Sequence, residues 1–507
     1  MCGAPATSRC ARCRGVWYCG PKCQRAAWGT HKAACAAAAA AAAARAEGAA
    51  AATGGGVDGG GGGGSGAPDA RGAPDGGDGG TGRLDAATLR EVSGAVAMLG
   101  SRKAAERATG ARTLCNICAH LGDSNRKLYE FQTAVVEAGG IPLLVRVLES
   151  RGHAADGVLA DAAAVVAELA AYNTDMQRAL YAAGVIPPLV TLLSSHSVDV
   201  QASAAGAMRN LSMNDENKFT IASAGAIPRL IALLSSHSVG VHEAAAGALL
   251  NLSRNDENQV KIASAGAIPR LIALLVSTSA GVQDAAAGAL RNLSVNVENK
   301  ITIASAGAIP RLIALMASHT VDVQEAAAGT LSNLSRNDEN KFTIASAGAI
   351  PRLIALLSSH SADVQEAAAG ALQNLSVNDE NKVTIASAGA IPRLIALLSS
   401  PAAGVQEAAA GALRNLSSNI VNKVTITSAG AIAPLIALLS SPSSGVQKNA
   451  AGALGCLGLN VENKAAIVSA GAISRLVALV SSPAVDVQEI AARALRVLRA
   501  VDSAVSN

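Results

Sequence analysis

The chain has few aromatic residues and little net charge. Only 2% of its 507 residues are Phe, Trp or Tyr, although 50% are apolar, so Ala, Leu, Ile and Val must build any core. Small side chains of this kind suit close packing between helices. The net charge of +4 is small for this length, and no basic stripe able to neutralise phosphates is present. We therefore expect no nucleic-acid partner.

Membrane and secretion signals are also lacking. No stretch has the length of a membrane span or the order of a secretory signal, and the Ala36–Ala44 run is short. Six of the nine cysteines lie in the first 35 residues. The tripeptide Asn-Leu-Ser recurs within predicted helices, where a secreted chain would expose it to glycosylation. These features favour the cytoplasm, the nucleus or both, and no membrane partner.

The chain does contain a segment of 41 residues that is repeated almost unchanged. A fixed period of roughly 40 residues is typical of a helical solenoid. Solenoids present long surfaces to partners and rarely enclose a catalytic cavity, so we predict that the protein is not an enzyme. One glycine of this segment recurs every 41 residues, at Gly184, Gly225, Gly266, Gly307, Gly348, Gly389, Gly430 and Gly471.

Composition divides the chain into four parts. Residues 1–35 form a Cys/His module, and residues 36–82 are rich in Ala and then Gly, which predicts a flexible linker. Residues 83–500 show helical patterning that amounts to nine or ten repeats, and residues 501–507 are a tail.

Each repeat is predicted to contain three helices. Asn381–Ala388 is a short first helix, which ends at Gly389 because glycine adopts positive φ readily. Pro392 lies at the start of the second helix, where its missing N–H costs nothing. The third and longest helix runs from Val405 to Ser417.

The phrases Gly-Ala-Ile-Pro-x-Leu-Ile-x-Leu-Leu and Ala-Leu-x-Asn-Leu-Ser resemble the armadillo repeat. They are similar to the repeats at the C-terminal end of plant U-box ubiquitin ligases. The resemblance covers roughly residues 84–500. It implies an all-α fold, a right-handed superhelical solenoid whose third helices line a concave groove.

In armadillo proteins that bind extended peptides, an Asn on the third helix holds the main chain of the ligand. A carboxamide both donates and accepts, so it can hold a peptide bond whatever the side chain. The alternative is that each Asn ties its repeat to the neighbouring backbone, and both roles are compatible. The matching residues are Asn210, Asn251, Asn292, Asn333, Asn374 and Asn415.

Two neighbouring positions refine this hypothesis. Nuclear-import armadillo receptors carry Trp one turn before the Asn, whereas this chain carries Gly, as at Gly288 and Gly329, so an importin-like function is rejected. The glycines indicate a close approach, by a ligand backbone or by the adjacent helix. The residue just before the Asn varies between copies, which indicates either a specificity position or drift on a solvated face.

The first 35 residues carry a zinc signal. Closely spaced thiolates and an imidazole are the ligands of tetrahedral structural zinc, and the presence of His argues against disulfides. The spacing, together with Trp17-Tyr18-Cys19, Cys23-Gln24 and His31-Lys32, resembles the MYND zinc finger.

The resemblance implies two zinc ions in a cross-braced order. One site would comprise Cys10, Cys13, His31 and Cys35, and the other Cys2, Cys19 and Cys23. The second site lacks one ligand, because the opening Cys of the family would precede Met1. Either the chain as given starts too late, which we favour, or this site has three protein ligands and is completed by water. MYND fingers bind short proline-containing peptides, and Gln24 and Trp28 match that surface.

These features together predict a non-enzymatic scaffold that is monomeric and binds proteins or short peptides. The finger would hold one peptide and the armadillo groove another partner, while the linker lets both act together. The alternative is a ubiquitin-ligase component, in which the finger recruits a conjugating enzyme and the repeats select the substrate.

Overall fold

The structure is a computed structural model of the whole chain, and it describes residues 8–9, 17–18, 83–122, 124–150 and 155–500. The chain forms two compact units, residues 1–79 and 80–507. In the first unit, strands β1 (Ser8–Arg9) and β2 (Trp17–Tyr18) pair antiparallel, with Ser8 opposite Tyr18. All other elements within the described residues belong to the second unit.

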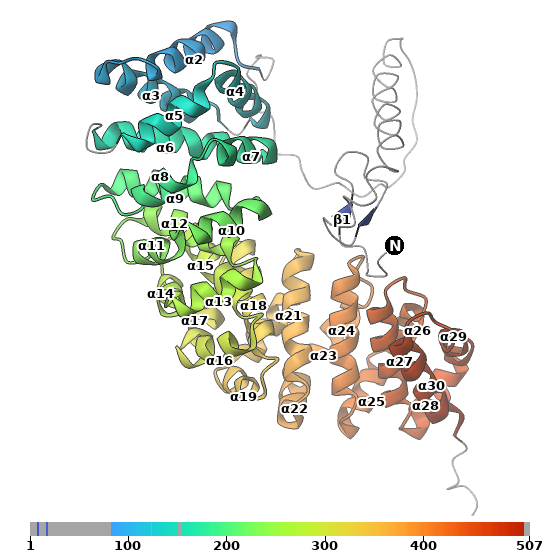
Figure 1. Cartoon of the computed structure of the whole chain (residues 1–507). Coiled ribbons are helices and arrows are strands. Elements are labelled where there is room, and N and C mark those ends of the chain that lie inside the picture. Colours follow the sequence, from blue (N-terminus) through green and yellow to red (C-terminus); the bar gives the residue numbers. More distant parts are fainter. Residues whose placement is uncertain (1–7, 10–16, 19–82, 123, 151–154, 501–507) are drawn as a thin grey trace, which may run out of the picture. The chain divides into compact units, whose positions relative to one another are not determined.

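The second unit is a stack of helices, as predicted (Figure 1). It opens with α2 (Ala86–Leu99), which packs on the first of the long inner helices. Ten of these long helices, the third helices, then follow one another within the described residues. They are α3 (Ala104–Ala119), α6 (Asp156–Ala170), α9 (Val198–Leu211), α12 (Val239–Leu252), α15 (Ala280–Leu293), α18 (Val321–Leu334), α21 (Ala362–Leu375), α24 (Ala403–Leu416), α27 (Ser444–Leu457) and α30 (Val485–Arg499).

Two shorter helices separate successive third helices. The first helices are α4 (Asn125–Glu137), α7 (Thr174–Ala182), α10 (Asp215–Ser223), α13 (Asp256–Ser264), α16 (Val297–Ser305), α19 (Asp338–Ser346), α22 (Asp379–Ser387), α25 (Ile420–Ser428) and α28 (Val461–Ser469). The second helices are α5 (Gly140–Glu149), α8 (Ile186–Leu192), α11 (Ala226–Leu233), α14 (Ala267–Leu274), α17 (Ala308–Leu315), α20 (Ala349–Leu356), α23 (Ala390–Leu397), α26 (Ile432–Leu438) and α29 (Ala472–Leu479).

Glycine makes the sharp bend between the first and second helices. Gly389 takes φ of 81° and precedes Ala390, the first residue of α23, as the sequence predicts. The seven other glycines at this 41-residue spacing share the left-handed conformation. A residue with a Cβ would be strained there, which fixes the angle between the two helices in every repeat.

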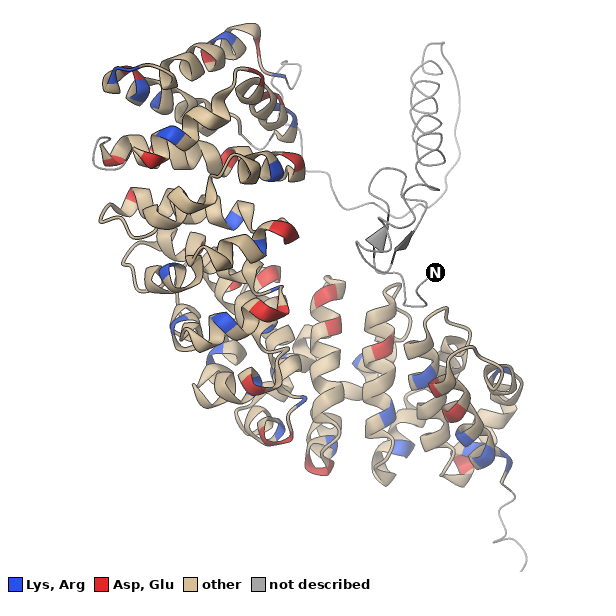
Figure 2. Cartoon of the chain, in the orientation of Figure 1, with Lys and Arg blue, Asp and Glu red and all other residues tan. Residues whose placement is uncertain are grey.

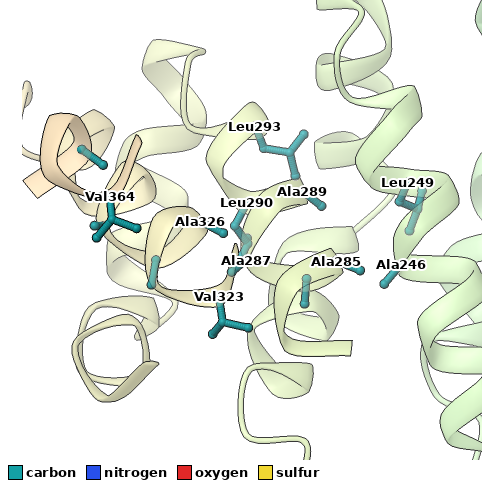
Figure 3. Close-up of a cluster of buried hydrophobic side chains, with 14 of the residues drawn as sticks. Ala246, Leu249, Ala285, Ala287, Ala289, Leu290, Leu293, Val323, Ala326 and Val364 are labelled. Carbon is teal, nitrogen blue, oxygen red and sulfur yellow. The ribbon is translucent and has the colours of Figure 1, made fainter. Parts of the chain in front are cut away.

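The core is continuous along the stack and consists mainly of Ala, Leu, Ile and Val. Figure 3 shows part of this core, with Ala246 of α12 facing Ala285 of α15 and Leu290 of α15 near Ala326 of α18. Alanine at these contacts lets third helices approach closely, so each helix buries its leucines between two neighbours. Burying one such leucine stabilises the fold by about 1.5–3 kcal/mol.

Among the helices that the structure describes, no single one combines the length and apolar character needed to cross a membrane. Two pairs of consecutive helices reach that length and apolar character only when the two helices of the pair are joined, and each pair is sharply bent at the junction.

Candidate functional site

An Asn near the end of each central third helix ties that helix to the one before it. In six consecutive repeats the Asn Nδ2 donates a hydrogen bond to a backbone carbonyl oxygen of the preceding third helix. The tie between repeats that the sequence offered as one alternative is therefore present. The bonds run from Asn210 to Ala167 (2.8 Å), Asn251 to Arg209 (2.9 Å), Asn292 to Leu250 (3.1 Å), Asn333 to Arg291 (3.1 Å), Asn374 to Ser332 (2.9 Å) and Asn415 to Gln373 (2.9 Å).

Each carboxamide keeps hydrogen-bonding capacity on its other side. No described residue donates to any of the six Oδ1 atoms, and none of these oxygens is among the buried atoms without a partner, so they are open to solvent. Asn292 and Asn333 use their second N–H on the hydroxyls of Ser253 and Ser294, each at 3.1 Å. The tie fixes the plane of each amide, so its Oδ1 is oriented before a partner arrives.

The row of tied asparagines ends within the stack. Asn116 of α3 is exposed, and its side chain makes no hydrogen bond with a described residue. Cys456 occupies the corresponding position of α27, where no carboxamide is available. The row therefore spans α9 to α24.

From Gly247 to Gly452, the glycines at this repeat position make room for a side chain of the preceding repeat. A Cβ on Gly329 would lie 2.6 Å from Arg291 Nε, and one on Gly370 would lie 3.1 Å from Ser332 Oγ. Gly247, Gly288, Gly411 and Gly452 meet the equivalent side chains. The variable residue before each Asn therefore lies across the next helix. Of the two approaches that the sequence left open, the adjacent repeat is the one observed.

Ion pairs join some of these variable residues to the next helix. Arg291 lies 2.6 Å from Glu325, and Arg209 lies 3.7 Å from Glu243. Arg414 differs, because the residue corresponding to those glutamates is Lys448. Its guanidinium is instead 3.5 Å from Asn449 Oδ1. The inner face thus changes in charge from one repeat to the next.

The inner surface is hollowed across α18, α21 and α24. A hollow of about 400 Å³ is lined by Asn333, Gln373 and the carboxylates of Asp363, Glu366 and Glu407, among others. Figure 2 shows acidic residues on the neighbouring helices α21 and α24. This part of the groove is polar and offers both amide and carboxylate acceptors.

A second hollow, of about 290 Å³, extends over α9, α12 and α15 and includes Asn210 and Asn251. Its lining contains Asp284. Burial raises the pKa of Asp284, and nearby Asp322 and Glu325 raise it further. Carboxylates of successive repeats are therefore close enough to repel one another.

The predicted zinc ligands Cys2, Cys10, Cys13, Cys19, Cys23, His31 and Cys35 lie outside the described residues, as do Gln24 and Trp28. In the sequence, Cys10 and Cys13 lie between the paired strands β1 and β2, and Cys19 directly follows β2. Six thiols and one imidazole form a donor set that suits zinc. Within the described part of the chain, no group of three or more His, Cys, Asp or Glu could hold a metal.

Comparison with solved structures supports the solenoid. A crystal structure of an engineered protein from the Northeast Structural Genomics Consortium shares 34% identity, with a TM-score of 0.71. The match covers 81% of this chain and 99% of that one. Two further engineered proteins from the same consortium, 33% and 35% identical, each cover 46% of this chain with TM-scores of 0.44 and match 98% and 96% of their own lengths. No curated protein sequence matches the chain.

Family models identify both parts of the chain. The MYND finger matches residues 1–35, which confirms the predicted finger. The armadillo/beta-catenin-like repeat matches residues 173–213, 214–254, 255–295, 296–336, 337–377, 378–418, 419–455 and 460–500, together well over half of the chain. The protein is therefore a member of the armadillo-repeat family that carries an N-terminal MYND finger.

Proposed function

We propose that the protein is a non-enzymatic scaffold whose inner face holds the main chain of an extended partner. The observation that carries this proposal is the row of solvent-open Oδ1 atoms on tied asparagines. Asn333 lines the hollow on α18, and Asn210 and Asn251 line the hollow over α9 and α12. An acceptor held in a fixed orientation can receive a peptide N–H without losing further side-chain freedom.

The repeat spacing fits an extended peptide. Neighbouring third helices lie about one helix diameter apart, roughly 10 Å. Three residues of an extended chain in the polyproline II conformation rise about 9 Å and complete one turn, so every third peptide unit faces the same side. One Asn would therefore meet every third peptide unit, and the carboxylates of the central hollow favour basic side chains between these contacts.

The finger supplies a second contact under this proposal. Cys10, Cys13, His31 and Cys35 would hold one zinc ion, and Cys2, Cys19 and Cys23 would hold another. Zinc in such a site is structural, and it orders a segment too short to have a core of its own. Gln24 and Trp28 would contact a short peptide, and the basic residues of the finger favour acidic partners.

Two recognition modules on one chain raise affinity for a partner that engages both. We place this monomeric scaffold in the cytoplasm or the nucleus. The Asn-Leu-Ser asparagines are tied inside the stack, where a glycan would break the contact between repeats.

A peptide selection tests the groove. Random extended peptides are selected against the full chain, and binding is then compared with a variant carrying Asn292→Ala, Asn333→Ala and Asn374→Ala. We expect binding to weaken by roughly one to three orders of magnitude, since each hydrogen bond contributes about 0.5–1.5 kcal/mol. Peptides that bind the triple variant equally well would show that partners use another face.

A second variant separates binding from stability, because the same asparagines tie the repeats. Ser332→Arg keeps every Asn and places across the inner face the side chain that Arg291 already provides in the preceding repeat. Gly370 leaves room for it. We expect unchanged melting and altered peptide selection. If this variant selects the same peptides and the Asn variant only melts lower, the asparagines serve the stack alone.

A further inference from the structure

The first helices carry a line of exposed apolar side chains, one in each of six consecutive repeats. These residues are between 48% and 67% exposed, although each is large and apolar. The helices that bear them follow one another from repeat to repeat along the stack in Figure 1. We name this line the first-helix row: Phe219 of α10, Val260 of α13, Ile301 of α16, Phe342 of α19, Val383 of α22 and Val424 of α25.

The residues of the row change between copies but stay apolar. The exposed position just after each third helix, by contrast, alternates between apolar and basic residues. Successive repeats carry Met213, Arg254, Val295 and Arg336 there. Exposed positions in this chain are therefore free to become polar, and the first-helix row has not done so. A row of exposed apolar side chains that recurs over six repeats is typical of a surface that contacts another molecule.

Glutamates flank the row on the same face of the helices. Each lies three residues before the apolar residue, which puts the two side by side on the helix surface. All five are exposed, and among the described residues only Glu216 makes an ion pair, with Arg178 at 3.7 Å. The five are Glu216, Glu257, Glu298, Glu339 and Glu380.

In three of the first helices, α10, α19 and α22, the lysine is already paired with an aspartate of its own helix. Lys341 and Lys382 are largely buried and pair with Asp338 and Asp379, each at 2.5 Å. Because these lysines turn to the first residue of their own helix, they leave the glutamates uncompensated. An acidic line therefore runs beside the apolar line.

One ring of the row shows what kind of group the surface accepts. Lys261 of the next repeat places its Nζ 5.7 Å from the centroid of Phe219. The residue in the same relation to Phe342 is Thr384, so no cation of the described residues lies over this ring. A cation on an aromatic face is worth about 0.5–1 kcal/mol at an exposed site. The Phe342 ring is open to a basic side chain of a partner.

We propose that the first-helix row docks a basic amphipathic α-helix of a protein partner. Repeats lie about one helix diameter apart, roughly 10 Å, and seven residues of an α-helix rise about 10.5 Å. A partner with apolar residues seven apart would thus meet successive members of the row, and its Lys and Arg side chains would reach the glutamates. An extended strand does not fit, because residues three apart point to opposite faces.

The test uses the full chain and a labelled peptide of about three heptads, with Leu at every seventh position and Lys or Arg flanking it. Fluorescence anisotropy measures binding, and circular dichroism measures helix gained on binding. We expect binding with a gain of helix. The variant Ile301→Ser, Phe342→Ser, Val383→Ser should bind at least roughly tenfold more weakly. So should Glu298→Gln, Glu339→Gln, Glu380→Gln.

Matched controls come from the same chain. Val198, Val239 and Val321 are between 46% and 48% exposed at the start of third helices, and Ser444 occupies the equivalent position of α27. Changing these three valines to Ser should leave peptide binding unchanged. Changing Glu91→Gln, Glu149→Gln and Asp199→Asn removes the same number of exposed charges away from the row and from both hollows, and it should also leave peptide binding unchanged.

Three results would overturn the proposal. One is equal binding of a peptide with the same composition in scrambled order, which would reduce the contact to non-specific charge. Another is binding without a gain of helix. The third is a dimer of the full chain that the Ile301, Phe342 and Val383 substitutions dissociate, which would make a second copy the occupant. All variants should keep the melting temperature of the parent, because the altered side chains are exposed.

Discussion

Glycine has two different roles inside the third helices. At Gly206 of α9, no atom lies within 4 Å of the place that a Cβ would occupy. At Gly110 of α3, a Cβ would lie 2.5 Å from the carbonyl oxygen of Ala95 and 3.0 Å from the amide nitrogen of Leu99. Gly110 thus sets the distance between α2 and α3, whereas Gly206 contributes only flexibility to the unfolded chain.

Substitution by alanine should therefore have opposite effects at these two positions. Gly206→Ala is expected to raise the free energy of unfolding by about 0.5–1 kcal/mol, since alanine is the better helix former. Gly110→Ala should lower it by about 1–3 kcal/mol, because backbone atoms of α2 must move. Urea titration followed by circular dichroism measures both. A loss of stability in Gly206→Ala would show that a neighbour packs there.

The repulsion around Asp284 should appear as a pH dependence. Its pKa is raised above 3.8 in the folded state, so the unfolded state releases its proton first as the pH rises. Ionised Asp284 therefore lowers the free energy of unfolding at pH values above its folded-state pKa. Well below pH 3.8 the carboxyl is protonated in both states, and this effect is absent. Asp284→Asn should stabilise the protein at pH 7 by less than about 1 kcal/mol, because the side chain is partly exposed. Equal melting shifts at pH 3 and pH 7 would contradict this account.

Residue identities indicated the asparagine row from the sequence, but its hydrogen bonds could not be predicted. The acceptor of Asn374 is the carbonyl of Ser332, 42 residues earlier, and that contact depends on the register between stacked helices. The first-helix row was missed for a related reason. Phe219 has the apolar character of a core residue, yet Asn217, Lys218 and Ile221 of the same helix are the buried ones. Periodicity cannot separate these faces in a nine-residue helix.

At the scale of elements, the type of helix was easier to predict than its first residue. Gly389 and Pro392 fixed the bend and the second helix as expected. The first helix was expected to start at Asn381, whereas α22 starts at Asp379. Asn378 caps it and accepts a hydrogen bond from the amide of Asn381 at 3.0 Å. An asparagine caps the first helix at the equivalent position of seven consecutive repeats, from Asn214 to Asn460.

Such caps should matter because the first helices are short. Asn378→Ala is expected to lower the free energy of unfolding by about 1 kcal/mol, since one amide of α22 loses its acceptor. Thr320 precedes α18, but its side chain makes no capping hydrogen bond. Thr320→Ala is therefore a control, and it should lower the free energy of unfolding by only a few tenths of the loss expected for Asn378→Ala. Equal losses in the two variants would show that helix propensity, not capping, sets the effect. Thermal unfolding of both variants measures the difference.

At the scale of the molecule, the stability of each repeat depends on its contacts with the neighbouring repeats. Each third helix packs against the next along the whole stack, and each repeat alone buries too little to fold. The alternation of helical pattern and glycine was enough to predict this all-α solenoid from the sequence. The finger is a different case, because the proposal makes its order depend on zinc, and family likeness alone assigns its ligands.

The two compact units should therefore respond independently to loss of metal. Zinc chelation of the full chain is expected to unfold residues 1–35 while the helical circular dichroism of the solenoid stays nearly unchanged, because the donor set lies entirely within the first unit. Tryptophan fluorescence reports the finger selectively, since both tryptophans, Trp17 and Trp28, lie in it. The triple change Cys10→Ser, Cys13→Ser, His31→Ala should reproduce the fluorescence of the chelated protein and bind less zinc. A large loss of helical signal on chelation, or undiminished zinc in that variant, would place metal in the solenoid and contradict the assignment.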